Sequence, residues 1–163
     1  LGAKSINESI LTNLSLIRES SFQLIWQTGS TYYNVIQSKK LESTNIKILP
    51  FIDRMDLAYS VADVIISRAG AIAISELCVV GKPLILVPSP NVVDDHQTKN
   101  AQDVLTKNAC LVVNDYKAKD ILLKEAINLL NDNNKLMLIS SNLKELAKPN
   151  ASKNIVNELY NLL

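Results

Sequence analysis

The sequence predicts an open, doubly wound α/β domain, in which a parallel sheet carries helices on both faces. Short apolar runs alternate regularly with helical patterns, which is typical of right-handed βαβ units. Runs such as Leu84-Ile85-Leu86-Val87 are apolar throughout, as expected for strands that are covered on both faces. The length of 163 residues fits a single domain, so one domain is expected over residues 1–163.

The first half of the chain contains two of the expected strands. In order, we expect a helix over 4–19, a strand over 22–27, a helix over 30–41, a strand over 46–52 and a short helix over 55–61. The first helix is predicted by apolar residues at helical spacing, Ile6, Ile10, Leu14 and Ile17. Thr28 and Gly29 are turn residues that end the first strand.

The second half contains the other three strands. In order, we expect a strand over 63–67, a helix over 72–80, a strand over 84–87, a helix over 96–108, a strand over 110–113, and helices over 118–130, 134–147 and 151–162. Gly81 is expected to end the helix before it, as glycine commonly does at helix C-termini. Pro83 and Pro88 bracket the fourth strand.

Composition narrows the class of protein. The chain is 47% hydrophobic and 20% charged, which is typical of a soluble globular domain. The net charge of +1 gives no indication of nucleic-acid binding. No apolar run approaches the roughly 20 residues of a membrane span, and no signal peptide is visible, so a cytoplasmic protein is expected. Cys78 and Cys110 lie inside apolar runs, which favours buried free thiols over a disulfide.

Ligands of such sheets bind at the carboxyl ends of the strands, where loops lead into helix N-termini. The segment Ser67 to Glu76, SRAGAIAISE, is one such loop and helix. Gly70 and Ala71 keep the turn small, and free N–H groups at the helix start favour an anion such as phosphate. Glu76 lies about one turn further on, where its carboxylate can either bind a sugar diol or compensate the helix dipole. The spacing alone does not decide between these two roles.

A second candidate segment is Pro88 to Ala101, which contains the only histidine, His96. Gln97 and Asn100 share one face at the head of a predicted helix, and their amides suit sugar hydroxyls. Asp95 is a candidate N-cap. A metal site is the less favoured alternative, because no second histidine is present at ligand spacing.

The segment Phe51 to Met55 also follows an expected strand. An aromatic ring and free main-chain groups there can hold a flat heterocycle, or Asp53 can cap the next helix above a hydrophobic staple. Gly2 and Ala3 form another small-residue turn. No Gly-x-Ser-x-Gly elbow, CxxC or P-loop motif is present, and adjacent Asp94 and Asp95 are poorly placed for a paired-carboxylate glycosidase.

Several of these segments together resemble the MurG family of peptidoglycan glycosyltransferases, in the same order and over nearly the whole chain. The segments are LGAKSIN (1–7), WQTG (26–29), PFIDRM (50–55), ADV (62–64), SRAGA (67–71), SE (75–76) and DHQTKNA (95–101). The resemblance implies the C-terminal, Rossmann-like, donor-binding half of a GT-B enzyme. It also implies that the acceptor domain and the first strand precede Leu1, so that the chain is a piece of a longer protein.

The resemblance also implies roles for individual residues in binding UDP-N-acetylglucosamine. Main-chain amides of Ala71, Ile72 and Ala73 would meet the diphosphate and sugar, although Ala73 stands where the family often has a hydroxyl. Glu76 would hold the ribose hydroxyls, and the main chain of Ile52 would read the uracil edge. Gln97 and Asn100, with His96 adjacent, would contact the N-acetylglucosamine. Gly2 and Ala3 would end a glycine-rich loop near the phosphates.

The implied reaction is an inverting transfer of N-acetylglucosamine to lipid I, giving lipid II, with no cofactor and no metal at the diphosphate. The general base, the lipid I site and the contact with the inner face of the cell membrane would belong to the missing domain, so no catalytic residue is expected here. The isolated chain is expected to bind the donor without turnover. Two alternatives stay open: a domain like UDP-N-acetylglucosamine 2-epimerase, and a non-catalytic α/β interaction domain.

Overall fold

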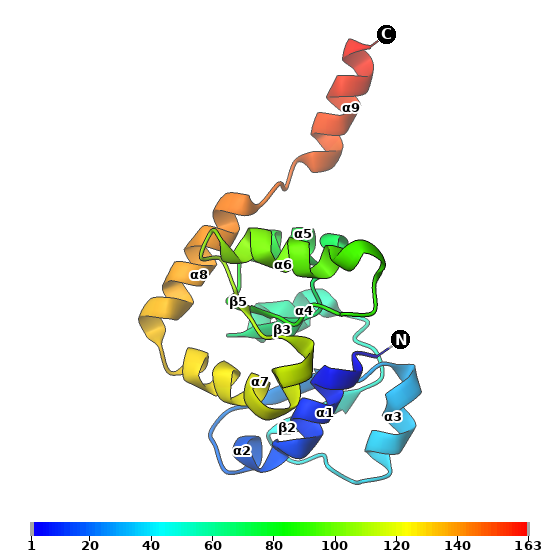
Figure 1. Cartoon of the computed structure of the whole chain (residues 1–163), viewed down its shortest axis with the longest axis vertical. Coiled ribbons are helices and arrows are strands. Elements are labelled where there is room, and N and C mark those ends of the chain that lie inside the picture. Colours follow the sequence, from blue (N-terminus) through cyan, green and yellow to red (C-terminus); the bar gives the residue numbers. More distant parts are fainter. Residues whose placement is uncertain (1, 163) are drawn as a thin grey trace.

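The computed structural model describes residues 2–162 and confirms a parallel α/β fold with helices packed around the strands (Figure 1). The strands are β1 (Leu24–Gln27), β2 (Ile46–Leu49), β3 (Ile65–Ser67), β4 (Leu84–Leu86) and β5 (Leu111–Val112). The helices are α1 (Lys4–Thr12), α2 (Leu14–Arg18), α3 (Ser30–Gln37), α4 (Met55–Val61), α5 (Ala71–Val80), α6 (His96–Leu105), α7 (Asp115–Leu130), α8 (Asn133–Leu146) and α9 (Ala151–Asn161).

The strands pair in two separate ladders. β1 pairs with β2 in parallel, and β3, β4 and β5 form a parallel sheet in that order. The three residues of β4 are fully buried, which explains its uniformly apolar sequence. Each parallel pair is joined by a helical crossover, as the alternating sequence pattern predicts.

Two apolar cores follow the two ladders, and the helices α1 and α7 connect them. One core surrounds β3, β4 and β5, and the other surrounds β1 and β2. On α7, Leu122 packs into the first core while its neighbour Leu123 packs into the second. Ile6 on α1 contacts both. The α1–α7 pair therefore holds the two halves of the molecule together.

The expectation of one helix over 4–19 is wrong, because the helix breaks at Asn13 between α1 and α2. The Asn13 side chain donates to the carbonyls of Ser9 (2.9 Å) and Lys119 (2.7 Å). Asparagine commonly ends helical backbone in this way, because its amide competes for main-chain groups. The bond to Lys119 also fixes the break against α7.

The end of α5 agrees with the sequence, whereas the loop before α6 has a conformation that the sequence pattern does not indicate. Gly81 does end α5, in the left-handed conformation with φ 65°. The loop before α6 was not predicted in detail: it forms a short 3₁₀ turn (Val93–Asp95) in which Asp94 and Asp95 have φ 52° and 51°. Aspartate tolerates this region better than most residues, because its side chain can bond locally.

The last helix, α9, projects away from the rest of the molecule after the turn at Lys148 to Asn150 (Figure 1). None of its residues is buried, and its apolar side chains Ile155, Val156, Leu159 and Tyr160 are exposed. The helix therefore adds nothing to either core.

Candidate functional site

The first turn of α5 opens at the carboxyl end of β3. Ile74 N–H is bonded to the carbonyl of Gly70 (2.9 Å), so the amides of Ala71, Ile72 and Ala73 precede the first bond within the helix. A Cβ atom built on Gly70 meets nothing within 4 Å, so the space beside this turn is open. The Ile72 side chain is 87% exposed. The turn can therefore accept an anionic group against its main chain.

Glu76 lies in the second turn of α5, on the exposed side of the helix. The first turn contains no acidic residue. Since the helix dipole acts mainly within the first turn, dipole compensation does not account for an acid at position 76. The position thus favours the ligand-binding alternative that the spacing left open.

Glu76 lines a surface hollow of about 410 Å³ between α4 and α5. The other lining residues are Asp56, Tyr59, Ser60, Val80 and Lys82. Burial raises the pKa of the Tyr59 phenol, and the Glu76 carboxylate raises it further through its charge and a hydrogen bond. Tyr59 and Glu76 therefore lie close to each other on the wall of this hollow.

Ile52 lies just before α4, in the loop after β2, where the sequence predicts a main-chain contact with a heterocycle. Its N–H donates to Gln27 Oε1 (2.9 Å), a side chain at the end of β1. Gln27 therefore shapes this loop, a role that sequence reasoning missed because nothing in the pattern over 22–27 indicates a partner 25 residues further along the chain. Phe51 is 64% exposed beside it.

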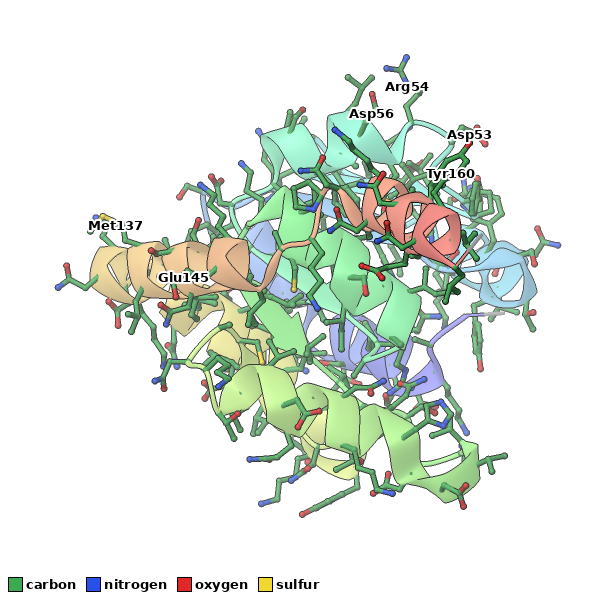
Figure 2. The ribbon with its side chains drawn as sticks, turned by 90° about the horizontal axis from the view of Figure 1, so that it is seen from above. Asp53, Arg54, Asp56, Met137, Glu145 and Tyr160 are labelled. Atoms are coloured by element: carbon green, nitrogen blue, oxygen red, sulfur yellow. The ribbon has the colours of Figure 1, made fainter. Side chains whose placement is uncertain are left out.

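The alternative in which Asp53 caps α4 is wrong. The N-cap residue is Arg54 rather than Asp53, and it has no side-chain cap bond. Arg54 instead makes a two-point ion pair with Asp56 at 2.9 and 2.6 Å, which points into solvent at the rim of α4 (Figure 2). This pair lowers the pKa of the Asp56 carboxyl, mainly through the Arg54 hydrogen bonds. Because both side chains are largely exposed, the pair contributes little stability.

The head of α6 carries the two predicted amide side chains, and each makes one hydrogen bond to the main chain of a nearby loop. Gln97 Oε1 accepts from the N–H of Ser89 (2.9 Å), and Asn100 Nδ2 donates to the carbonyl of Ala69 (3.1 Å). Each amide has a second polar end, so Gln97 still offers donors and Asn100 an acceptor. Both side chains are only partly buried, so their bonds to the loops are compatible with contact to a ligand.

His96 and Asp95 stand at the exposed start of the same helix. His96 Nδ1 donates to the carbonyl of Val93 (2.7 Å). Asp95 occupies the N-cap position as predicted, but its carboxylate accepts from the Thr98 hydroxyl (2.6 Å) instead of a helix N–H. Within residues 2–162, no group of three His, Cys, Asp or Glu side chains is arranged to hold a metal ion.

Gly2 and Ala3 are placed at the same edge by contacts with the loop after β1. A Cβ atom on Gly2 would lie 2.2 Å from the Thr28 carbonyl oxygen, so only glycine fits against this loop. The buried Asn7 amide donates to the same carbonyl (2.9 Å) and accepts from Trp26 Nε1 (2.9 Å). The start of α1 is therefore fixed at the end of β1, with Ala3 at its N-cap position.

Arg68 is a further residue at this edge that sequence reasoning did not single out. It lies inside the SRAGA segment, between β3 and α5, and its guanidinium contacts Asp115 at the start of α7 and Ser5 in α1. An arginine directly after a buried strand is a sequence signal for such a contact, but its partner lies 47 residues away.

In the part of the chain that the structure describes, no helix is long and apolar enough to cross a membrane.

Comparisons with known proteins agree on a family. The profile of the glycosyltransferase family 28 C-terminal domain matches residues 1–158. A relative from Cytophaga hutchinsonii is 45% identical over 163 residues, and one from Porphyromonas gingivalis is 44% identical over 165 residues. Both are named UDP-N-acetylglucosamine–N-acetylmuramyl-(pentapeptide) pyrophosphoryl-undecaprenol N-acetylglucosamine transferase. The chain is covered completely but spans only 44% of each relative.

Solved structures support the same assignment. The crystal structure of MurG from Acinetobacter baumannii matches 99% of this chain and 47% of its own length, with a TM-score of 0.81 and 31% identity. The glycosyltransferase VinC matches 88% of this chain and 35% of its own, with a TM-score of 0.63 and 13% identity, which shows the shared fold alone. Because the family profile covers nearly the whole chain, the chain belongs to glycosyltransferase family 28, as its C-terminal domain.

Proposed function

We propose that this chain is the donor-binding half of an inverting glycosyltransferase that moves N-acetylglucosamine from its UDP conjugate to lipid I, giving lipid II. The observation that carries the proposal is the position of Glu76 in the second turn of α5, beside an open first turn. A phosphate on the amides and a diol on the carboxylate together fit a nucleotide sugar. The names of the curated relatives support this donor.

Each site residue has a place in this proposal. The amides of 71–73 bind the diphosphate, and Gly2 and Ala3 lie near it. Glu76, which lines the hollow beside Tyr59, accepts hydrogen bonds from the ribose hydroxyls. Ile52 offers its main-chain carbonyl to the uracil, since its N–H is bonded to Gln27. The free ends of Gln97 and Asn100, with His96 beside them, contact the N-acetylglucosamine.

The chemistry follows from where charge develops. An acceptor hydroxyl attacks the anomeric carbon while the bond to the diphosphate breaks, so negative charge builds on UDP. Main-chain amides at a helix N-terminus stabilise such charge without moving during the reaction. The general base, the lipid I site and a peripheral contact with the inner face of the cell membrane are assigned to the remainder of the longer protein. The 163-residue chain alone then binds the donor and catalyses nothing.

We also propose that the residues before Leu1 supply an acceptor domain and a strand between β1 and β3. The start of α1 contacts the carboxyl ends of both strands, through Thr28 after β1 and Arg68 after β3. A segment leading into α1 would thus run between the two separate ladders. The relatives, of which this chain spans 44%, have the length for a second domain.

Calorimetric titration with UDP-N-acetylglucosamine tests the donor assignment. We expect the Glu76→Ala variant to lose about tenfold in affinity, since at least one hydrogen bond to a charged group disappears. Glu145→Ala is the matched control, because Glu145, labelled in Figure 2, is an exposed acid on α8 that does not line the hollow beside Glu76. Absence of binding to the wild-type chain, or equal affinity of the Glu76 variant, would instead favour a non-catalytic interaction domain.

A further inference from the structure

Three polar side chains, Ser5, Arg68 and Asp115, form a cluster at the carboxyl edge of the strands. Arg68 Nη1 donates to Asp115 Oδ1 and to the carbonyls of Val87 (3.0 Å) and Pro88 (3.4 Å). Its Nη2 donates to Ser5 Oγ (3.1 Å), and this hydroxyl donates to Asp115 Oδ1 (2.5 Å). The Arg68 and Asp115 side chains are 24% and 23% exposed. Water therefore screens this pair much less than a surface pair such as Arg54 and Asp56.

The cluster lies where three helices begin. Ser5 is in the first turn of α1, Asp115 is the first residue of α7, and α5 begins three residues after Arg68. The adjacent strands do not need the cluster for their alignment, because main-chain bonds such as Val87 N–H to the Ser67 carbonyl (2.8 Å) already join them. What Arg68 adds is a link from the loop after β3 to the loop after β4 and to both other helix starts.

The residue after Arg68 is held from another direction. Ala69 is fully buried, and its carbonyl accepts from the Asn100 amide on α6 (3.1 Å). Arg68 is thus held by Asp115 and Ala69 by Asn100, while a Cβ atom on the next residue, Gly70, would point into open space. These two contacts fix the chain directly before the first turn of α5, while the body of the helix is held by its buried residues Leu77 and Cys78.

We propose that Arg68, held by Asp115 and Ser5, is a positioning residue for the donor diphosphate. It sets the turn 68–70 so that the amides of 71–73 face the leaving group, and it acts through them without touching the donor. This role rests on the proposed function. Lysine cannot replace it, because one ammonium group cannot serve a carboxylate, a hydroxyl and two carbonyls in a fixed planar array.

The test uses the full-length polypeptide that contains this chain, with UDP-N-acetylglucosamine and a lipid-linked acceptor analogue. For Arg68→Lys we expect the donor KM to rise about tenfold while the acceptor KM stays within about twofold of wild type. Asp115→Asn should raise the donor KM as well. The double variant should have a donor KM no higher than that of Arg68→Lys alone, because both changes disrupt the same Arg68–Asp115 contact. Arg18→Lys is the control, since Arg18 donates to the Leu41 carbonyl (3.0 Å) ahead of β1 and β2, at the opposite edge.

Two results would overturn the positioning role. One is a folded Arg68→Lys protein with the donor KM of wild type, and the other is an equal rise of donor and acceptor KM, which a general structural defect would produce. If Arg68→Lys does not fold, Ser5→Ala decides the question by the same donor KM, because it removes one hydroxyl, with its contacts to Arg68 Nη2 and Asp115 Oδ1, and leaves the Arg68–Asp115 pair in place. A wild-type protein that does not use UDP-N-acetylglucosamine refutes the proposed function together with this role, whereas a working enzyme with unaffected variants refutes the role alone.

Discussion

At the residue scale, Gly2 and Gly70 differ in whether the fold requires a glycine. Gly2 is required by packing, because a Cβ atom there would meet the Thr28 carbonyl and the Tyr32 ring. Gly70 is required neither by packing nor by its backbone, which has φ −69° and ψ 141°, values that any residue adopts. Gly70 is the N-cap residue of α5, where glycine is favoured over alanine, and it also leaves the space that the proposed diphosphate needs beside the turn.

This contrast gives a prediction. Gly70→Ala should change the free energy of unfolding by less than about 1 kcal/mol, since alanine fits the backbone and restricts the unfolded chain but is a poorer N-cap residue than glycine. The same substitution should weaken UDP-N-acetylglucosamine binding about tenfold, because the methyl group stands where the phosphates approach. Gly2→Ala should instead reduce the free energy of unfolding by about 1–3 kcal/mol through the clash. Chemical denaturation and calorimetry measure both, and unchanged donor affinity of Gly70→Ala would argue against phosphate at this turn.

Also at the residue scale, the two cysteines have no role in the site and lie in the core. Cys78 and Cys110 are free and buried, which agrees with the expected absence of a disulfide. Burial raises the pKa of the Cys110 thiol to about 12, and the nearby Cys78 adds to the shift. Both therefore act as small core residues.

At the element scale, α8 and α9 differ in what they contribute. α8 packs Ile139 and Leu143 into the larger core, and its Ser140 hydroxyl donates to the Gly81 carbonyl (2.6 Å) at the end of α5. α9 has comparable length and an apolar side, but that side faces solvent. Helical periodicity alone does not separate these two cases.

The difference predicts opposite outcomes for two changes in this chain. Deletion of residues 149–163 should alter the free energy of unfolding by less than about 0.5 kcal/mol, because α9 buries no apolar side chain. Leu143→Ala should cost about 2–5 kcal/mol, because Leu143 is fully buried in the core. Urea denaturation of both variants checks this, and a large loss on deletion would mean that α9 packs against the domain in solution.

At the scale of the whole molecule, α1 and α7 are the main connection between two cores. The Ser5–Asp115 and Asn13–Lys119 bonds reinforce that connection at both ends of α1. The strand ladders themselves are separate. Within residues 2–162, one edge of β1 and one edge of β3 pair with no other strand, which is where the proposed strand would add.

A chain extended by its natural preceding residues tests this proposal. The added strand should raise the free energy of unfolding and slow hydrogen exchange at main-chain groups of β1 and β3 that do not bond to β2 or β4, because new ladder bonds protect them. An extension of equal length made of glycine and serine serves as the control. Equal exchange in the two extended chains would show that the ladders stay apart.

Much of the fold was predictable from residue order, because burial imposes local patterns. The five strands, the αL glycine at 81 and the carboxyl-edge loops follow from apolar runs and turn residues. The break at Asn13 was not predictable, because it depends on a carbonyl more than a hundred residues away. Local periodicity contains no information about such a partner.

For the site, the sequence by itself determined which residue types meet the carboxyl edge: small residues at 70, 71 and 73, an acid at 76 and amides at 97 and 100. Only the tertiary structure decided what each can still offer a ligand. It placed Glu76 beyond the reach of the helix dipole, occupied one end of each amide, and joined Arg68 to Asp115. The physical reason is that a hydrogen bond depends on distance in space, and distant segments come within that distance only after the chain has packed.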